Sequence, residues 1–179
     1  MTNQVQIPNL ENLNYLPYLD DNGCISEDWQ GKIGVYAIFD DDKALQFVGY
    51  SRNTYLSLKQ HLVSQPQNCY WFKVQTISRP SRTLLEDIKQ AWIRENGVVP
   101  NGNGADELEW GHSIDVKPLM SEAEQLAYAE TDELTKPKFL KNVARRIEAE
   151  IKEVLAGRNV QMEIRFNPKL KEQGILSLK

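Results

Sequence analysis

Two short apolar segments, separated by a charged run, constrain the fold of this chain more than any other feature of its sequence. Residues 33–39 and 44–49 are rich in β-branched and aromatic side chains, as strands are. The four residues between them, 40–43, are three aspartates and a lysine, which suit a short turn. We therefore predict that these segments form a β-hairpin.

The pattern after the hairpin predicts two helices and one more strand. Asn53 can cap a helix that runs to about Ser64, and residues 69–77 favour a third strand. A second helix is predicted from Thr83 to Asn96, where apolar residues recur at helical spacing and Gly97 follows as a terminator. The order β-β-α-β-α indicates the α/β (α+β) class, with a small mixed three-stranded sheet flanked by helices.

The remainder of the chain divides into three further parts. Residues 1–30 are polar and broken by proline and glycine, so we expect an extended leader. Residues 105–120 form an acidic linker after the module at 31–104. Residues 121–179 form a C-terminal extension, in which 139–154 carry the apolar face of a long helix and 160–166 alternate like a half-buried strand.

Charge is unevenly distributed, although the net charge is only −4. Residues 31–104 carry nine basic and six acidic side chains, and residues 136–179 carry eleven and five. Residues 105–135 carry nine acidic side chains and one basic. Since phosphate binding is largely electrostatic, the net charge argues against nucleic acid, but the two basic segments still allow a local positive surface.

The composition predicts a cytoplasmic protein that does not enter a membrane. Its apolar runs are far shorter than the roughly 20 residues needed to cross a bilayer, and no charged-then-apolar segment opens the chain. Cys24 and Cys69 are too few for a disulfide framework, and with His61 and His112 they show no zinc-ligand spacing. We expect both thiols to be reduced.

Short motifs within residues 31–104 resemble those of the GIY-YIG nucleases. The tripeptides at 34–36 (Gly-Val-Tyr) and 47–49 (Phe-Val-Gly) stand where that family has a Gly-x-Tyr strand and a Tyr-Ile-Gly strand. A glutamate on the second predicted helix, Glu86, is followed by Pro-Asn-Gly-Asn at 100–103, as in the family. The resemblance implies a GIY-YIG-like module.

The resemblance also implies roles for individual residues. Glu86 would hold one Mg²⁺, because a hard cation prefers oxygen ligands, and Tyr36 would serve the attacking water. His61 and Arg52 would complete the catalytic set around the phosphate. Phosphate or substrate binding is implied for Gly34, Gly49, Lys59 and Asn103.

Two positions depart from the family pattern, and several residues have structural alternatives. Phe47 stands where the second tyrosine is usual, and Ser57 stands where an arginine is expected. Glu86 also fits a capping box begun by Thr83 or a surface pairing with Arg82 or Gln90, and Tyr36 and Phe47 also fit core packing. Asn103 by composition belongs to a turn, and His112 is interpreted as a solvated loop residue.

Three functions follow as hypotheses. The first is a Mg²⁺-dependent DNA endonuclease, which requires the Tyr36 hydroxyl and the Glu86 carboxylate to face one cleft. The second is a catalytically degenerate GIY-YIG module that binds nucleic acid or a partner without cleaving. The third is a protein-interaction role in which the acidic segment 105–135 either docks a basic partner or covers the basic face of the module itself.

Overall fold

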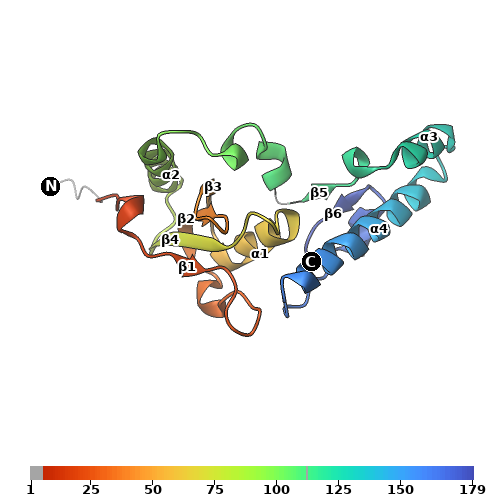
Figure 1. The fold of residues 1–179 in the computed structure, drawn as a ribbon. Coiled ribbons are helices and arrows are strands. Elements are labelled where there is room, and N and C mark those ends of the chain that lie inside the picture. Colours follow the sequence, from red (N-terminus) through yellow and green to blue (C-terminus); the bar gives the residue numbers. More distant parts are fainter. Residues whose placement is uncertain (1–5, 112) are drawn as a thin grey trace. The chain divides into compact units, whose positions relative to one another are not determined.

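A computed structural model describes residues 6–111 and 113–179, so His112 and its predicted role lie outside the described residues. The described chain forms two compact units that divide between Trp110 and Gly111. Figure 1 shows the helices and strands of each unit.

The first unit is built on a four-stranded sheet. Its strands lie in the order β1 (Leu16–Pro17), β4 (Trp71–Ile77), β2 (Ile33–Phe39) and β3 (Leu45–Ser51). The predicted α/β class and the β2–β3 hairpin are confirmed. The sheet is antiparallel throughout rather than mixed, because β4 runs opposite to β2 and the predicted leader adds β1 antiparallel to β4.

The hairpin turn is stabilised by the side chain of Asp40. Its Oδ1 accepts hydrogen bonds from the backbone N–H groups of Asp42 and Ala44, at 3.0 and 2.9 Å. Lys43 closes the turn with a positive φ of 61°. This short turn sets the register in which Tyr36 faces Gly49 and Val35 faces Tyr50.

Two helices cover the sheet. Helix α1 (Thr54–Ser64) begins at the predicted cap Asn53, and α2 (Arg82–Asn96) ends at Gly97, whose φ of 83° is left-handed. The cap of α2 is Ser81, whose hydroxyl accepts from the N–H of Leu84, and not Thr83. The capping-box interpretation of Glu86 is therefore wrong.

Successive residues of β2 point to opposite faces of the sheet, and each face meets a different helix. Val35 and Ala37 pack in a core with Leu85, Ile88 and Trp92 of α2. Tyr36 points the other way, where its ring contacts His61 of α1. This alternation decides which predicted site residues can meet.

The segment before the hairpin contributes to the core of the first unit. Leu10, Tyr18 and Ile25 are buried, and the indole Nε1 of Trp92 donates to the carbonyl of Pro8 at 3.0 Å. The Glu95 carboxylate accepts from the backbone N–H groups of Leu10 and Glu11, both at 2.9 Å. Residues 8–11 are therefore packed against α2.

The second unit is organised around one long amphipathic helix. Helix α4 (Lys136–Gly157) packs against the four-residue helix α5 (Pro168–Lys171) and against strand β6 (Ile175–Leu176), which pairs with β5 (Ile114–Asp115) in a two-stranded antiparallel sheet. Helix α3 (Glu122–Glu130) precedes it. The buried residues of α4 are Leu140, Val143, Ala144, Ile147 and Leu155.

The predicted strand at 160–166 is not formed. Only Phe166 makes a bridge, to Leu178. Ile164 and Phe166 are nevertheless buried, so the alternation arises from a loop that packs apolar side chains into the unit. Within the described parts of both units, no helix is long and apolar enough to cross a membrane.

Candidate functional site

A buried tyrosine–histidine pair lies between the sheet and α1. The Oη of Tyr36, from the middle of β2, is 2.8 Å from Nε2 of His61, from the last turns of α1. Both side chains are about 1% exposed. Burial raises the pKa of Tyr36 well above its usual value, and a hydrogen bond with the Ser57 hydroxyl opposes that rise. Tyr36 is therefore a neutral phenol at ordinary pH.

Two serine hydroxyls extend this polar cluster. The Oγ atoms of Ser57, on α1, and Ser51, at the end of β3, are 2.7 Å apart. Ser57 stands where the resemblance predicts an arginine, and it is 4% exposed. An uncharged hydroxyl there leaves the buried cluster without a cation.

Aromatic rings cover the Tyr36–His61 pair. The ring of Phe47 stacks on Trp110, with centroids 5.2 Å apart and planes at 4°. Both rings contact His61, at centroid distances of 4.6 Å for Phe47 and 5.7 Å for Trp110. Nothing in the local sequence pattern around Trp110 links it to β3, so the sequence alone does not place this ring over the pair.

The glycines of the predicted motif are explained by packing. A Cβ at Gly49 would lie 2.5 Å from the Phe47 ring and 2.9 Å from the Tyr36 hydroxyl. A Cβ at Gly34 would lie 2.8 Å from the carbonyl oxygen of Gln75, on the neighbouring strand. Close contacts inside the fold therefore require both glycines, whether or not a phosphate ever approaches them.

Asn103 has a clear structural function. Its Oδ1 accepts from the N–H of Val48 at 2.8 Å, and its Nδ2 donates to the carbonyl of Val48 at 2.7 Å. The side-chain amide thus pairs with the outer edge of β3 as another strand would. Its predicted role in substrate binding would require these two bonds to break.

Glu86 lies on the other side of the sheet from Tyr36. It belongs to α2, where its carboxylate accepts from Nε2 of Gln90 at 2.9 Å. Its pKa is lowered by the hydrogen bond from Gln90, and further by Tyr50, Lys89 and Arg82. The convergence of Tyr36 and Glu86 on one cleft, which the nuclease hypothesis required, is not found.

The donor set around Glu86 does not fit a magnesium ion. The groups next to this single carboxylate are an amide donor and a phenol, with two cations close by. Among the residues that the structure describes, no group of three or more His, Cys, Asp or Glu side chains could hold a metal ion. We therefore assign no chemical step to a metal at Glu86.

The predicted basic residues lie outside the buried cluster. Arg52, just before α1, is exposed, and Lys59, on α1, is half-buried. In the described chain neither makes a hydrogen bond or ion pair with Tyr36 or His61. Of the predicted site, the structure therefore brings together Tyr36, His61 and Gly49.

A separate charged surface runs along α4. Lys138, Lys141 and Arg145 form no ion pair within the described chain. Further along, Glu148 accepts from Lys152 at 3.2 Å and from Lys171 at 2.5 Å. We call Lys138, Lys141 and Arg145 the basic stripe.

Comparison with known proteins gives one informative match. No family model matches the chain. A curated relative, the bifunctional monothiol glutaredoxin-S16, chloroplastic, of Arabidopsis thaliana, is 42% identical over 74 residues. The match covers 39% of this chain and 25% of the relative, so the chain spans about a quarter of the length of the protein it matches.

These findings contradict the predicted membership of the GIY-YIG nucleases. The matching relative is named as a glutaredoxin, and no nuclease family model matches. The DNA endonuclease and the degenerate GIY-YIG module are therefore both withdrawn. The physical reason for the error is that glycines and aromatics in a tightly packed hairpin produce the same short motifs. A segment of the chain is similar in sequence to part of a protein that is named as a glutaredoxin.

Proposed function

We propose that this chain is a binding protein for duplex DNA and that the basic stripe of α4 is its contact surface. The observation that carries this proposal is the set of three cations left without an acidic partner in the described chain. At 100° per residue, Lys141 and Arg145 lie within about 60° of Lys138 around the helix axis. All three therefore project from one side of α4.

The spacing of the stripe suits a phosphate backbone. Seven residues separate Lys138 from Arg145, which is about 10 Å along a helix. One DNA strand advances about 3.4 Å per phosphate along the duplex axis, so three side chains over this length can reach neighbouring phosphates. Beyond the stripe, Lys152 and Lys171 share the single carboxylate of Glu148.

The salt dependence of binding tests this proposal. Affinity for a duplex oligonucleotide, measured by fluorescence anisotropy between about 50 and 200 mM salt, should fall linearly on logarithmic axes. Replacing Lys138, Lys141 and Arg145 with glutamine should reduce that slope by about 2.7, which is 0.9 per lost contact. Lys117→Gln, an exposed lysine of the same unit outside α4, is the control. An unchanged slope in the triple variant would refute the proposal.

A second candidate function is favoured by the name of the relative: thiol redox or iron–sulfur chemistry. Cys69 is fully buried, whereas Cys24 is half-buried in a loop, and no C-x-x-C pair is present. The Cys24 thiolate would attack oxidised glutathione, forming a mixed disulfide and releasing one glutathione thiolate. Mass spectrometry should then find one glutathione on wild type and on Cys69→Ser, but none on Cys24→Ser. An absence of adduct on the wild type would exclude this candidate.

The proposal includes a cytoplasmic location. Neither Cys24 nor Cys69 forms a disulfide in the described chain, as in proteins of reducing compartments. The relative is described as chloroplastic, which is a statement about that protein. Microscopy of the tagged full-length protein in its own cells would test the location.

A further inference from the structure

Helix α3 and the turn after it each expose a large apolar side chain to solvent. None of its residues is buried, and a helix of nine residues is too short to be stable in water by itself. Leu126, in its middle, is 70% exposed, and Leu134, shortly after it, is 95% exposed. A helix that buries none of its residues and exposes a large apolar side chain has the character of an interaction surface.

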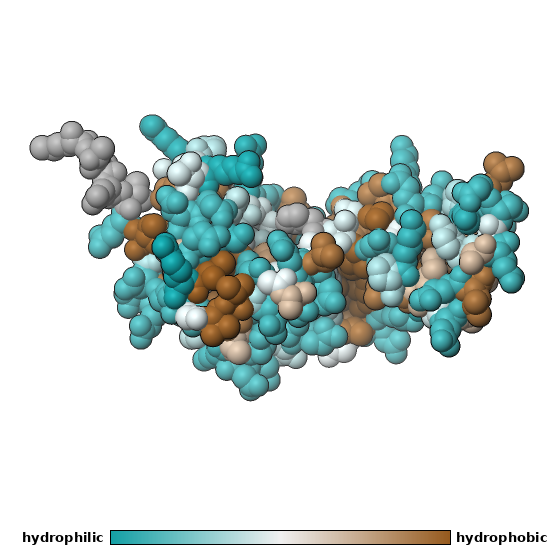
Figure 2. Space-filling view, turned by 90° about the horizontal axis from the view of Figure 1, so that it is seen from above, coloured by the Kyte–Doolittle hydropathy of each residue, from teal (hydrophilic) through white to brown (hydrophobic). Residues whose placement is uncertain are grey.

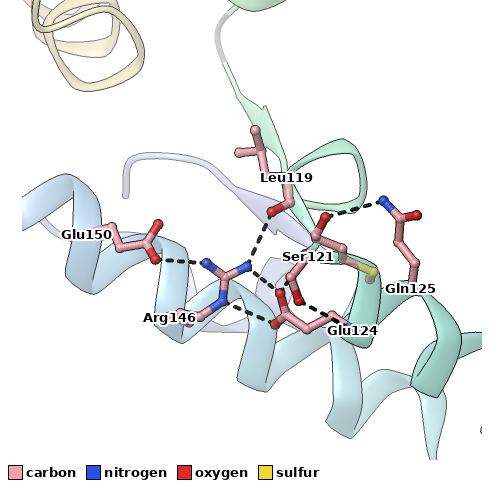
Figure 3. Close-up of polar contacts among 7 residues, drawn as sticks. Leu119, Ser121, Glu124, Gln125, Arg146 and Glu150 are labelled. Atoms are coloured by element: carbon pink, nitrogen blue, oxygen red, sulfur yellow. Dashed lines mark hydrogen bonds and ion pairs between the residues drawn. The ribbon is translucent and has the colours of Figure 1, made fainter.

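Polar contacts hold α3 in place on α4. Ser121 and Glu124 form a reciprocal capping box at the start of α3. Arg146 of α4 donates to both carboxylate oxygens of Glu124, at 2.5 and 3.1 Å, and to the carbonyl of Leu119 at 3.3 Å (Figure 3). The rings of Tyr128 and Phe139 add a contact at 5.7 Å. Glu124 and Tyr128, one turn apart, therefore define the side that faces α4.

The opposite side of α3 combines apolar and acidic groups. Leu126 lies about 200° around the helix from Glu124, and Glu122 and Glu130 lie within about 40° of Leu126. Neither of these glutamates forms an ion pair in the part of the chain that the structure describes. Figure 2 shows hydrophobic groups standing among hydrophilic ones at the end of the second unit that carries α3.

We propose that this face, which we call the α3 face and define as Glu122, Leu126 and Glu130, docks a basic amphipathic helix of another protein. Such a helix carries leucine-like residues on one side and Lys or Arg beside them. It would cover Leu126 while its cations meet Glu122 and Glu130. The segment 105–135, with nine acidic side chains and one basic, supplies a negative potential that is complementary to a basic helix.

Charge and shape argue against a second copy as the occupant. Because α3 has a glutamate at each end of its apolar face, two α3 helices would place acid against acid in either direction. The basic stripe of a second copy has the right charge, but Asn142 and Ala149 lie on the same side of α4 as the stripe, and neither offers a large apolar side chain. The α3 face is also distinct from the stripe, so it adds to the proposed DNA binding.

Peptide binding to the full chain tests this inference. The probe is a fluorescent Leu/Lys amphipathic peptide of about 14 residues, four helical turns, compared with a scrambled peptide of the same composition. We expect the amphipathic peptide to bind about tenfold tighter than the scrambled one, and Leu126→Ser or the pair Glu122→Gln and Glu130→Gln to remove that difference. Val154→Ser and Glu153→Gln, exposed changes of the same kinds on α4, should leave it intact.

Two kinds of result, a lack of recognition or self-association, would overturn the inference. Equal binding of the two peptides to wild type, or unchanged binding by Leu126→Ser, would show that the α3 face recognises no amphipathic helix. Concentration-dependent dimerisation of the chain that Leu126→Ser abolishes would identify a second copy as the occupant instead. Far-UV circular dichroism of Leu126→Ser verifies that the fold is kept. Loss of DNA binding in the stripe variants would change neither result.

Discussion

Tyr36 shows how one buried hydroxyl can stabilise the first unit. Its contact with His61 satisfies polar groups of both side chains where water is excluded. Tyr36→Phe should therefore lower the free energy of unfolding by about 1–3 kcal/mol, since a buried partner is left unsatisfied. Urea denaturation measures the change. Tyr15→Phe, at a tyrosine that is 37% exposed, should change it by less than about 0.5 kcal/mol, and equal effects would contradict this role.

The raised pKa of Tyr36 makes a separate prediction at high pH. The phenol stays protonated in the folded state after tyrosines of the unfolded chain, with pKa about 10, have ionised. Stability from this group is therefore complete below about pH 10 and falls by about 1.4 kcal/mol per pH unit above it. The unfolding free energy of Tyr36→Phe should fall less steeply than that of wild type between about pH 10 and 11. Parallel slopes would contradict the assignment.

Asn103 carries a residue-scale prediction of a different kind. Asn103→Ala removes both bonds to Val48 at the edge of β3, so the unfolding free energy should fall by about 1–3 kcal/mol. Asn101→Ala, in the same loop but with an exposed side chain, is the control and should be nearly neutral. Thermal or urea unfolding compares the two variants. An Asn103→Ala variant as stable as wild type would show that water replaces the two hydrogen bonds to Val48.

At the scale of elements, two neighbouring arginines of α4 have different roles. Arg146 holds α3, whereas Arg145 belongs to the basic stripe. Arg146 joins Glu124 and Glu150, whereas Arg145 is exposed and unpaired in the described chain. Arg146→Gln should lower the hydrogen-exchange protection of α3 amides by about 5- to 30-fold, as loss of about 1–2 kcal/mol implies. Arg145→Gln should leave α3 unchanged. Equal protection in both variants would mean that Arg146 does not hold α3.

Acid should have the same effect on α3 as the loss of Arg146. The bond from Arg146 lowers the pKa of Glu124, so its stabilisation is present above the unfolded glutamate value of about 4.3 and is lost as pH falls through the folded value. The difference in α3 protection between wild type and Arg146→Gln should therefore shrink below about pH 4. A difference that persists in acid would contradict the role of the carboxylate.

Elements with strong local patterns were predictable, and those that depend on distant partners were not. The hairpin, both helices of the first unit and the long α4 follow from apolar periodicity and from Asn53, Gly97 and Gly157 at helix ends. Strand β1 has two residues and exists only because β4 offers an edge. The run at 160–166 alternates like a strand, but the described chain supplies only one bridge, at Phe166.

The candidate site was predictable only in part. Alternation along a strand shows which of its residues share one face of the sheet, but not which helix covers that face. Sequence reasoning selected Tyr36, His61 and Glu86 from their order along the chain. That order does not show which face of the sheet each helix covers, and α1 and α2 cover opposite faces. The roles of Gly49 and Trp110 also depend on contacts that no local pattern encodes.

At the scale of the whole molecule, the first unit has the elements of an independent fold. Residues up to Trp110 have their own sheet, two covering helices and a core that includes Leu10 and Trp92. A fragment of residues 1–110 should therefore fold alone, with dispersed amide resonances and cooperative urea unfolding. The aromatic cover of the Tyr36–His61 pair is the sensitive point, because Trp110 is the last residue of this fragment.

The unfolding free energies of two fragments measure how much Trp110 contributes to the stability of the first unit. A fragment that ends at residue 109 lacks the ring that stacks on Phe47, so it should unfold about 3–5 kcal/mol more easily than the fragment that ends at 110, as for a large buried aromatic. Trp110→Phe in the longer fragment should restore part of the difference, because a smaller ring can still lie against Phe47. If fragments 1–109 and 1–110 were equally stable, Trp110 would not belong energetically to the first unit, and the unit boundary would lie earlier in the chain.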